Sequence, residues 1–303
     1  MSRNHPPTHS PSGYSIVPYK PEEVYQLAQH LEPEAYRVTQ KAGTEPAFCG
    51  NLVNNKQQGI YVCVVCGLPL FSSEEKFESD TGWPSFFAPY DSSHLVISED
   101  KSFGITRSDI SCVRCQAHLG HVFNDGPAPT GLRYCLNSAA LTFANLAYFA
   151  GGCFWGVEHI FRQAPGVISV ESGYQQGEVE HPTYEQVCSG KTGHAESVRV
   201  LFDPSKISYK DLVTGFFAMH DPTQKDRQGP DIGEQYRSGI WYVSDEQKET
   251  AQGVIDELTR LGSFSRPILT QVEQAKPFYP AEEVHQQYIE KTGTVCHVAN
   301  PWK

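Results

Sequence analysis

Two pairs of cysteines constrain the fold of this chain more than any other sequence feature. Cys63 and Cys66 form one CxxC motif, Cys112 and Cys115 form a second, and residues 67–111 separate the two pairs. Each CxxC can bind a metal from one tight turn, and two such pairs supply the tetrahedral thiolate shell of a structural zinc site. Because a closed shell leaves no position for a substrate, we expect a structural zinc ion. Redox-active dithiols or unrelated cysteines are the alternative interpretations.

Composition excludes several functional classes. The chain has 303 residues, a net charge of −11 and nine cysteines. This length allows two domains, and the negative charge argues against nucleic acid or an anionic membrane as a partner. No apolar run approaches the roughly 20 residues that span a membrane. Residues 1–15 lack the apolar core of a secretory signal, so we expect a disordered tail on a cytoplasmic protein. In that compartment, cysteines serve metal binding or catalysis.

The pattern of apolar residues changes near residue 145, which predicts two domains. Over residues 16–144, short β-like runs alternate with Gly, Pro, Asp and Ser clusters, and only residues 21–40 have helical spacing. This half is expected to be mainly antiparallel β-sheet. Residues 146–303 alternate strand and helix patterns in the order β-α-β-β-α-β, which predicts a ferredoxin-like α+β sandwich.

The strand-like run RYCLN carries a candidate nucleophile. On a regular strand Arg133, Cys135 and Asn137 share one face, where Arg133 would stabilise a thiolate and Asn137 would orient an imidazole. Upstream, His118 and His121 would lie on opposite faces unless the glycine between them marks a bulge. Together these residue types support nucleophilic chemistry. Ordinary core or surface positions are the alternative for each of them.

Three features of this half together resemble the B-type methionine sulfoxide reductases. They are TGWPSF at 81–86, the run over residues 118–141, and the four CxxC cysteines. The resemblance implies that Cys135 attacks the sulfur of the R epimer of methionine sulfoxide. It implies that the two histidines hold or protonate the sulfoxide oxygen and that Trp83 packs on the S-methyl group. Two supporting residues follow from the same likeness, Asp125 and Asn137.

The chain departs from this family at one position. Many B-type enzymes carry a resolving cysteine directly before the GWPSF segment, and here that residue is Thr81. Cys49 is the one cysteine of this half without another assigned role. We therefore predict that Cys49 reaches Cys135 by a loop movement and forms an intramolecular disulfide with it.

A second candidate nucleophile lies in the stretch GGCFWG, residues 151–156. Cys153 follows a predicted strand and precedes a predicted helix, whose free N–H groups and partial positive charge favour a thiolate. The glycines permit a tight turn and the close approach of a substrate. Phe154 and Trp155 are expected to line an apolar pocket for a methyl group. An ordinary turn with two core aromatics is the alternative.

The motifs that follow GCFWG resemble those of the A-type methionine sulfoxide reductases. They are GYQQG at 173–177, GHAESVRV at 193–200, HDPT at 220–223 and GPDIGEQYRS at 229–238. The resemblance implies that Cys153 is the nucleophile for the S epimer and that Glu196 protonates the sulfoxide oxygen. It further implies hydrogen bonds to that oxygen from Tyr174 and Tyr236, with Asp231 on the polar side.

Two cysteines remain. By the same resemblance Cys296, in a non-periodic Gly-containing segment, resolves the sulfenic acid formed on Cys153, whereas Cys188 is expected to be buried packing. Because each epimer requires its own enzyme, the chain is expected to reduce both epimers of methionine sulfoxide, free or in proteins, with thioredoxin as the reductant. A zinc-containing interaction module joined to a thiol peroxidase or disulfide oxidoreductase is the competing interpretation.

Overall fold

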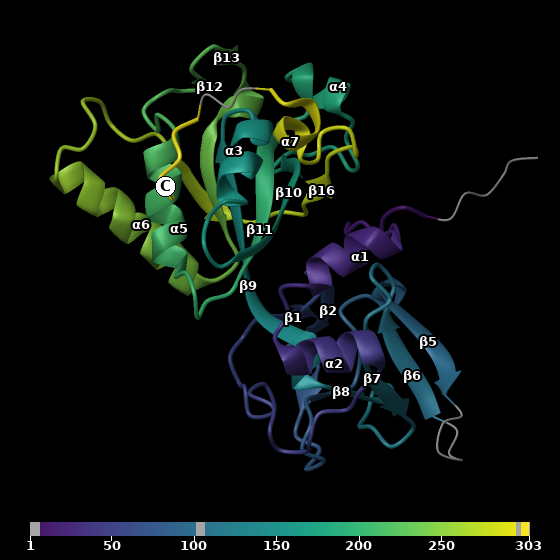
Figure 1. The fold of residues 1–303 in the computed structure, drawn as a ribbon. Coiled ribbons are helices and arrows are strands. Elements are labelled where there is room, and N and C mark those ends of the chain that lie inside the picture. The colour runs from purple at the N-terminus through teal and green to yellow at the C-terminus, as the bar shows by residue number, and fades with distance from the viewer. Residues whose placement is uncertain (1–6, 101–106, 295–297, 303) are drawn as a thin grey trace, which may run out of the picture. The chain divides into compact units, whose positions relative to one another are not determined.

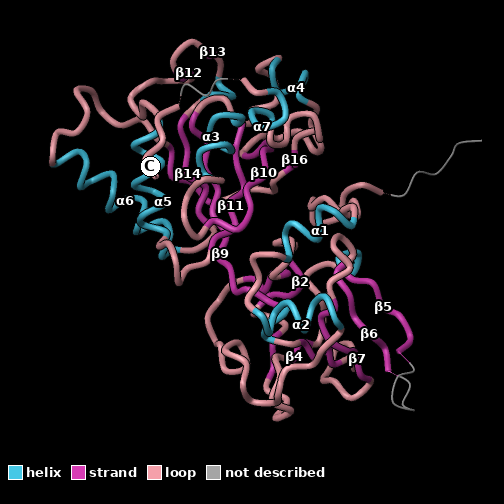
Figure 2. The backbone as a smooth tube through the Cα atoms, in the orientation of Figure 1, coloured by secondary structure: helices cyan, strands magenta, loops and turns pink. Residues whose placement is uncertain are grey.

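The computed structural model describes residues 7–100, 107–294 and 298–302. The chain divides into two compact units, Met1–Ala144 and Asn145–Lys303, which we call the N-terminal and C-terminal units (Figure 1). Each unit has its own helices and strands (Figure 2). Within the described residues, no helix combines the length and the apolar character needed to cross a membrane.

The N-terminal unit begins with two short helices, α1 (Pro21–Ala28) and α2 (Pro33–Lys41). The prediction of one helix over residues 21–40 is wrong, because Pro33 has no N–H to donate and holds the residue before it in an extended conformation. Glu32 accordingly has φ −56° and ψ 148°. Pro33 then starts α2, at a position where the missing N–H would have no partner within the helix.

The strands of the N-terminal unit form antiparallel pairs, which confirms the mainly antiparallel half. In one group β1 (Ile60–Cys63) pairs with β2 (Pro69–Ser72) and with the first residues of β9 (Leu141–Gly151). A larger sheet has the spatial order β3 (Lys76–Phe77), β4 (Ser85–Phe86), β8 (Arg133–Leu136), β7 (His118–Phe123), β6 (Arg107–Cys112) and β5 (Leu95–Asp100).

The predicted disordered tail over residues 1–15 is corrected for its described part, which begins at residue 7. Ser12 donates from its N–H and from its hydroxyl to one carboxylate oxygen of Asp91, at 3.0 and 2.8 Å. Tyr14 is buried, with 2% of its surface exposed. Ser12, a polar residue that composition alone would place in solvent, thus donates two hydrogen bonds to the buried carboxylate of Asp91.

One sheet runs through the C-terminal unit, and its neighbouring strands are antiparallel except for the parallel β14–β15 pair. Its order is β15 (Gln271–Gln274), β14 (Ser238–Tyr242), β9, β11 (Ala195–Phe202), β10 (Val167–Gln175) and β16 (Tyr279–Pro280). The helices are α3 (Phe154–Phe161), α4 (Tyr184–Cys188), α5 (Tyr209–Met219), α6 (Asp245–Arg260) and α7 (Tyr288–Thr292). A separate hairpin pairs β12 (Arg227–Gln228) with β13 (Asp231–Ile232).

The turn after β9 brings the second cysteine to the start of α3. Phe149 of β9 packs against Phe216 of α5, with ring centroids 5.2 Å apart. A Cβ on Gly151 would lie 2.8 Å from the Phe216 ring, and Gly152 has a φ of +96° that favours glycine. The turn therefore needs both glycines, and it places Cys153 directly before the first residue of α3.

Candidate active sites and metal centre

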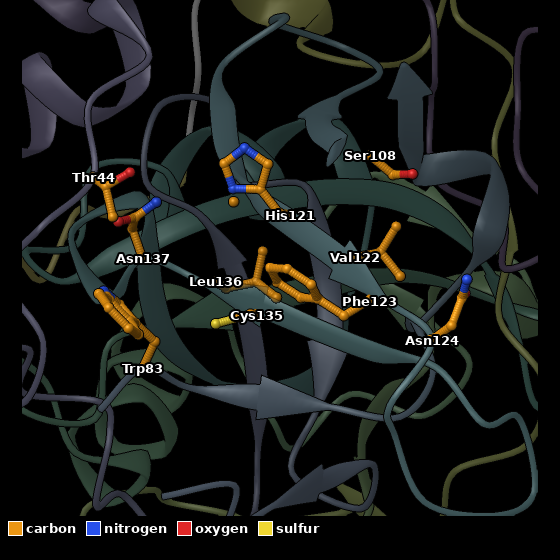
Figure 3. Close-up of a pocket in the computed structure, with 11 residues that line it drawn as sticks. Thr44, Trp83, Ser108, His121, Val122, Phe123, Asn124, Cys135, Leu136 and Asn137 are labelled. Carbon is orange, nitrogen blue, oxygen red and sulfur yellow. The ribbon is translucent and has the colours of Figure 1, made fainter. Parts of the chain in front are cut away.

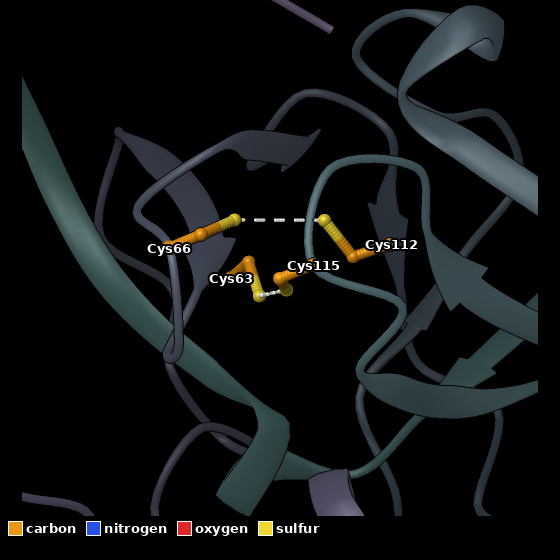
Figure 4. A group of neighbouring side chains, drawn as sticks. All are labelled: Cys63, Cys66, Cys112 and Cys115. Carbon is orange, nitrogen blue, oxygen red and sulfur yellow. Dashed lines mark hydrogen bonds between the residues drawn. The ribbon is translucent and has the colours of Figure 1, made fainter. Parts of the chain in front are cut away.

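The four CxxC cysteines come together in the N-terminal unit (Figure 4). Their sulfur atoms all lie within 4.8 Å of one another. The Sγ atoms of Cys63 and Cys115 are 3.5 Å apart, and those of Cys66 and Cys112 are 3.6 Å apart. Four sulfurs at about 2.3 Å from one tetrahedral zinc ion would be about 3.8 Å from each other. The donor set and its spacing therefore fit a closed four-thiolate metal site.

A buried arginine lies beside these cysteines. Arg114 is 8% exposed, donates to the carbonyl of Cys66 and lies 5.3 Å from the ring centre of Tyr19. Its Nε has no hydrogen-bond partner, and the described residues give the guanidinium no carboxylate partner. A buried cation is costly without a counter-charge. Four thiolates around one divalent cation keep a net negative charge, which would compensate Arg114.

A cavity of about 630 Å³ in the N-terminal unit contains the first candidate nucleophile (Figure 3). Cys135 enters it from β8, and its sulfur points to the side of the cavity where Trp83 lies. His121 enters from β7, and Asn137 follows the end of β8. The cavity thus brings together four of the residues that the sequence predicted for this site.

The two histidines reach the same side of β7 because the strand has a bulge. In the β6–β7 pairing, Ile110 lies opposite Gly120, but the next residue of β6, Ser111, lies opposite His118, so β7 has one extra residue here. The ring centroids of His118 and His121 are consequently 5.4 Å apart. A Cβ on Gly120 would collide with the Cys135 carbonyl oxygen, so glycine is needed where β7 passes β8. The predicted bulge is confirmed.

The surroundings of the two histidines differ. His121 lines the cavity, whereas His118 is buried and places its Nδ1 2.6 Å from an oxygen of Asp109. Burial alone would raise the pKa of Asp109, but its interaction with His118 lowers it. Sequence reasoning missed Asp109, which only the β6–β7 register brings beside the histidines. Asp125 forms a two-point ion pair with Arg133, at 2.9 and 2.8 Å.

The environment of Cys135 favours the thiol over the thiolate. Burial raises the pKa of Cys135, while the charge of Arg133 and hydrogen bonds with Thr81 and Ser85 act in the opposite direction. The stabilising effect expected of Arg133 is therefore present, but burial outweighs it. Thr81, at the position where many B-type enzymes have a cysteine, is in contact with Cys135.

Cys49 is exposed, and a hydrogen bond holds its loop next to Thr81. Phe48 donates its N–H to the carbonyl of Gly82 at 2.8 Å, and Gly82 directly follows Thr81. The loop that carries Cys49 is therefore hydrogen-bonded to the residue next to Thr81, and Thr81 itself contacts Cys135.

Asn137 and Trp83 share a partner that sequence reasoning missed. The N–H of Glu45 donates to Asn137 Oδ1 at 2.9 Å, and the Glu45 carbonyl accepts from Trp83 Nε1 at 3.1 Å. Asn137 also donates to the carbonyl of Leu119 at 3.0 Å. Glu45 is 92 residues from Asn137 and 38 from Trp83, separations that no motif or helical spacing reveals.

In the C-terminal unit, Cys153 occupies the N-cap position of α3. Burial, followed by the charge of Glu196, raises the pKa of Cys153 to about 12, against the opposing N–H groups of Trp155 and Gly156. The helix N-terminus thus has the predicted effect, but it is outweighed. The resting group is a thiol, so the reaction needs a proton acceptor within the site.

Glu196 of β11 is 1% exposed and lies beside that thiol. Its Oε2 accepts from the N–H of Phe154 at 3.0 Å, and its Oε1 is buried without a partner. Burial raises the pKa of Glu196 to about 8. The carboxyl group is therefore mostly neutral at pH 7, the state that a proton donor requires, and one of its oxygens is available to a ligand.

Two further predicted residues lie around the same carboxyl group. Tyr236, at the end of a short 3₁₀ helix (Glu234–Tyr236), has its pKa raised by burial and then by the charge of Glu196. The charges of Cys153 and Asp231 also act on the Tyr236 hydroxyl. The structure therefore gathers these four residues in one cluster at the start of α3.

Burial, a hydrogen bond with Glu282 and the charges of Glu282 and Glu196 raise the pKa of Tyr174. It lies directly opposite Glu196 in the β10–β11 pairing, but its hydroxyl donates to Glu282 at 2.9 Å. Tyr184, which sequence reasoning missed, has its pKa raised by burial, by a hydrogen bond with Cys188 and by the charge of Glu196. Cys188 is exposed, which corrects the expectation of a buried packing residue. In the sequence, nothing marks Tyr184 as a site residue except that Cys188 follows it four residues later.

The two aromatics after Cys153 have different roles in packing. Phe154 is buried, whereas Trp155 is half-buried and stacks on Tyr288, with ring centroids 3.8 Å apart and an interplanar angle of 11°. Trp155 Nε1 also donates to His285 Nδ1 at 3.3 Å. Residues near α7 thus cover one face of the indole. Cys296 lies outside the described residues.

Comparison with curated proteins supports the same division. A family model described as peptide methionine sulfoxide reductase matches residues 145–301, and one described as the SelR domain matches residues 31–145. Peptide methionine sulfoxide reductase MsrA of Methanosarcina mazei is 52% identical over 157 residues, which cover 52% of this chain and 74% of that protein. The MsrA of Acidobacterium capsulatum is 53% identical over 153 residues, which cover 50% of this chain and 98% of that protein.

Solved structures of such proteins are also similar to this chain. Reduced Mxr1 from Saccharomyces cerevisiae is 35% identical, with a TM-score of 0.48, over 51% of this chain and 90% of that one. Methionine sulfoxide reductase A of Corynebacterium diphtheriae is 32% identical, with a TM-score of 0.45, over 52% of this chain and 83% of that one. On the family matches, which together span residues 31–301, the chain belongs to the peptide methionine sulfoxide reductases and joins a B-type (SelR) domain to an A-type domain.

Proposed function

We propose that this reductase acts on the R epimer of methionine sulfoxide at Cys135 and on the S epimer at Cys153. The observation that carries the proposal is that each cysteine has its own proton-donating groups in its own unit. The sulfoxide sulfur is stereogenic, and each epimer needs a separate arrangement of nucleophile, methyl pocket and proton donor. Two sites on one chain meet that need.

At the C-terminal site, the Cys153 sulfur attacks the sulfoxide sulfur. The sulfoxide oxygen is transferred to Cys153 as a sulfenic acid, and methionine leaves as the thioether. Glu196 protonates this oxygen and takes up the proton that the Cys153 thiol loses, so the acid is regenerated. The raised pKa of Glu196 and its unpartnered Oε1 support this role. Phe154 and Trp155 contact the methyl group.

We assign the hydrogen bonds to the S-sulfoxide oxygen to Tyr174 and Tyr236, as the family resemblance implies. The influence of Glu196 on both hydroxyl groups supports this assignment. The Tyr174 hydroxyl donates to Glu282, a partner that it would exchange for the sulfoxide oxygen, whereas Tyr184 forms a hydrogen bond with Cys188.

At the N-terminal site, Cys135 makes the same attack on the R epimer. His121 donates to the sulfoxide oxygen, and its position in the cavity wall with Cys135 supports this role. His118, paired with Asp109, lies behind it and supplies the second imidazole. Trp83 packs on the methyl group from the same cavity.

Each sulfenic acid then condenses with a second thiol, releasing water and forming a disulfide. For Cys135 we propose Cys49, supported by the attachment of its loop next to Thr81. For Cys153 we propose Cys296, on the family resemblance. Both disulfides need an external dithiol, for which we propose thioredoxin in the reducing cytoplasm.

We propose zinc as the metal of the four-cysteine site, supported by the sulfur spacing and by the uncompensated charge of Arg114. Bound there, zinc would tie together the turns after β1 and β6 and take no part in the reaction. The strand order β14-β9-β11-β10, with α3 following β9 and α5 following β11, supports a ferredoxin-like C-terminal unit.

Separated epimers test the central proposal. Cys135→Ser is expected to lose reduction of the R epimer and keep reduction of the S epimer at the wild-type rate, and Cys153→Ser is expected to do the reverse. Methionine formation is measured by chromatography with dithiothreitol as reductant. If either variant loses both activities, independent sites are wrong.

A matched pair of variants tests the tyrosine assignment. Tyr174→Phe is expected to slow single-turnover reduction of the S epimer by about 10²-fold, because it removes one donor to developing charge. Tyr184→Phe is expected to slow it far less, and neither variant should change reduction of the R epimer. A larger loss in Tyr184→Phe than in Tyr174→Phe would assign the role to Tyr184 instead.

Glu196 also makes the stability of the C-terminal unit depend on pH. Its folded pKa of about 8 lies above the ordinary value of 4.5. Between these values the folded state binds more protons than the unfolded state, so stability falls as pH rises. Glu196→Gln removes this dependence while keeping an acceptor for the Phe154 N–H.

We expect Glu196→Gln to match the wild type near pH 4.5 and to be more stable by about 4 kcal/mol near pH 8. The same variant should lose reduction of the S epimer by at least roughly 10²-fold. Urea unfolding of both proteins across this range measures the difference. Parallel pH profiles would show that no buried neutral acid is present at residue 196.

Metal analysis tests the zinc site. One zinc ion per chain is expected, and Cys66→Ser should abolish binding. Arg114→Met is expected to release zinc to a chelator roughly 10–100-fold faster, as loss of an outer partner does at other sites. Arg37→Met, which removes an exposed arginine, is the control. Equal release rates for these two arginine variants would refute the proposed counter-charge.

A further inference from the structure

We propose that Glu45 is a positioning residue for the R-epimer site, holding the methyl-binding tryptophan, the end of β8 and the Cys49 loop in one arrangement. The proposal rests on the proposed role of the Cys135 cavity. Glu45 does not line that cavity itself; its neighbour Thr44 does. Its influence on the reaction would therefore pass through the residues that it holds.

The Glu45 side chain fixes the backbone just after the nucleophile. It is 5% exposed, and its two carboxylate oxygens accept from the N–H groups of Ser138 (2.6 Å) and Ala139 (2.9 Å). These residues begin the 3₁₀ turn Ser138–Ala140, three residues after Cys135. Hydrogen bonds to a carboxylate are stronger than those between neutral groups, so a buried charge holds the end of β8 in place.

The Glu45 backbone holds two walls of the cavity. Its N–H donates to Asn137 and its carbonyl accepts from the Trp83 indole. Asn137 is 3% exposed, so its amide has little freedom to exchange this partner for water. One residue thus sets the distance between the indole that packs on the methyl group and the strand that carries Cys135.

The loop of the proposed resolving cysteine starts and ends against the same carboxylate. A Cβ on Gly50 would collide with the Ser138 side chain and lie 2.8 Å from Glu45 Oε1. The chain therefore returns to Glu45 one residue after Cys49. This gives the loop two fixed ends, between which Cys49 would have to move to reach Cys135.

Glu45→Gln tests the proposal in the full chain. Glutamine has nearly the same size, and the hydrogen bonds of the residue-45 backbone to Asn137 and Trp83 remain. Its side-chain NH₂ cannot accept a hydrogen bond, so the N–H of Ser138 or Ala139 loses its acceptor. We expect kcat/KM for the R epimer to fall roughly 10–100-fold, mainly through KM, because a small displacement of Trp83 weakens substrate binding. The same molecules should reduce the S epimer normally and keep their zinc, which controls for folding.

A double-mutant cycle separates positioning from simple destabilisation. Trp83→Phe keeps an aromatic ring but removes the donor to the Glu45 carbonyl. If Glu45 acts through Trp83, the two changes are non-additive, and Glu45→Gln costs much less in the Trp83→Phe background. Glu75→Gln, a half-buried carboxylate of the same unit, is the matched control and should leave the R-epimer kinetics unchanged.

The outcomes are distinguishable. Additive effects in the cycle, or wild-type R-epimer kinetics in Glu45→Gln, would overturn the positioning role. If Glu45→Gln does not fold, Glu45→Asp keeps the charge but shortens its reach by one methylene, and a normal KM in that variant would overturn the proposal equally. Reduction of the R epimer by Cys135→Ser would instead refute the proposed function on which the inference depends.

Discussion

Strand β9 is the constraint on which both candidate sites depend. Its first residues pair with β1, whose last residue, Cys63, belongs to the metal site. Its later residues pair with β11 and β14. The chain enters β9 from the turn that Glu45 holds after Cys135, and leaves it at the glycines before Cys153. One continuous strand therefore contributes backbone hydrogen bonds to both folds, and in the sequence it separates the two proposed nucleophiles.

Burial of ionisable groups is the second common theme. It raises the pKa of both nucleophilic cysteines, although Arg133 at one site and backbone N–H groups at the other oppose it. It also raises the pKa of Glu196, which makes this residue a usable acid near neutral pH. A thiol beside a neutral acid is electrically neutral as a pair. The C-terminal site can therefore exclude water without burying a net charge, at the cost of stability as the pH rises.

The parts of the structure that follow from local patterns could be predicted from the sequence. The tight turns of the two CxxC pairs and the glycine turn before Cys153 depend on short motifs whose geometry is local. The residues of the Cys135 cavity come from distant parts of the sequence, and the family resemblance assigned Trp83 to this site. The break at Pro33 was also readable, because proline acts on its immediate neighbours, but the apolar spacing on both sides of it concealed the break.

The remaining features depend on contacts between distant residues. Strand register brought Tyr174 beside Glu196, but the direction of its hydroxyl was set by Glu282, 108 residues away. Glu45 likewise gains its importance from partners that tertiary folding brings to it. A sequence pattern records which face a side chain takes on its own element. It does not record which of several neighbours receives the hydrogen bond.

The most direct test of the two-site account is to locate the disulfide left by one turnover. The reduced chain is given one equivalent of a single epimer without reductant, then alkylated, digested and analysed by mass spectrometry. The account predicts a Cys49–Cys135 disulfide after the R epimer and a Cys153–Cys296 disulfide after the S epimer. The same disulfide after both epimers, or one that joins Cys135 to Cys153, would contradict it.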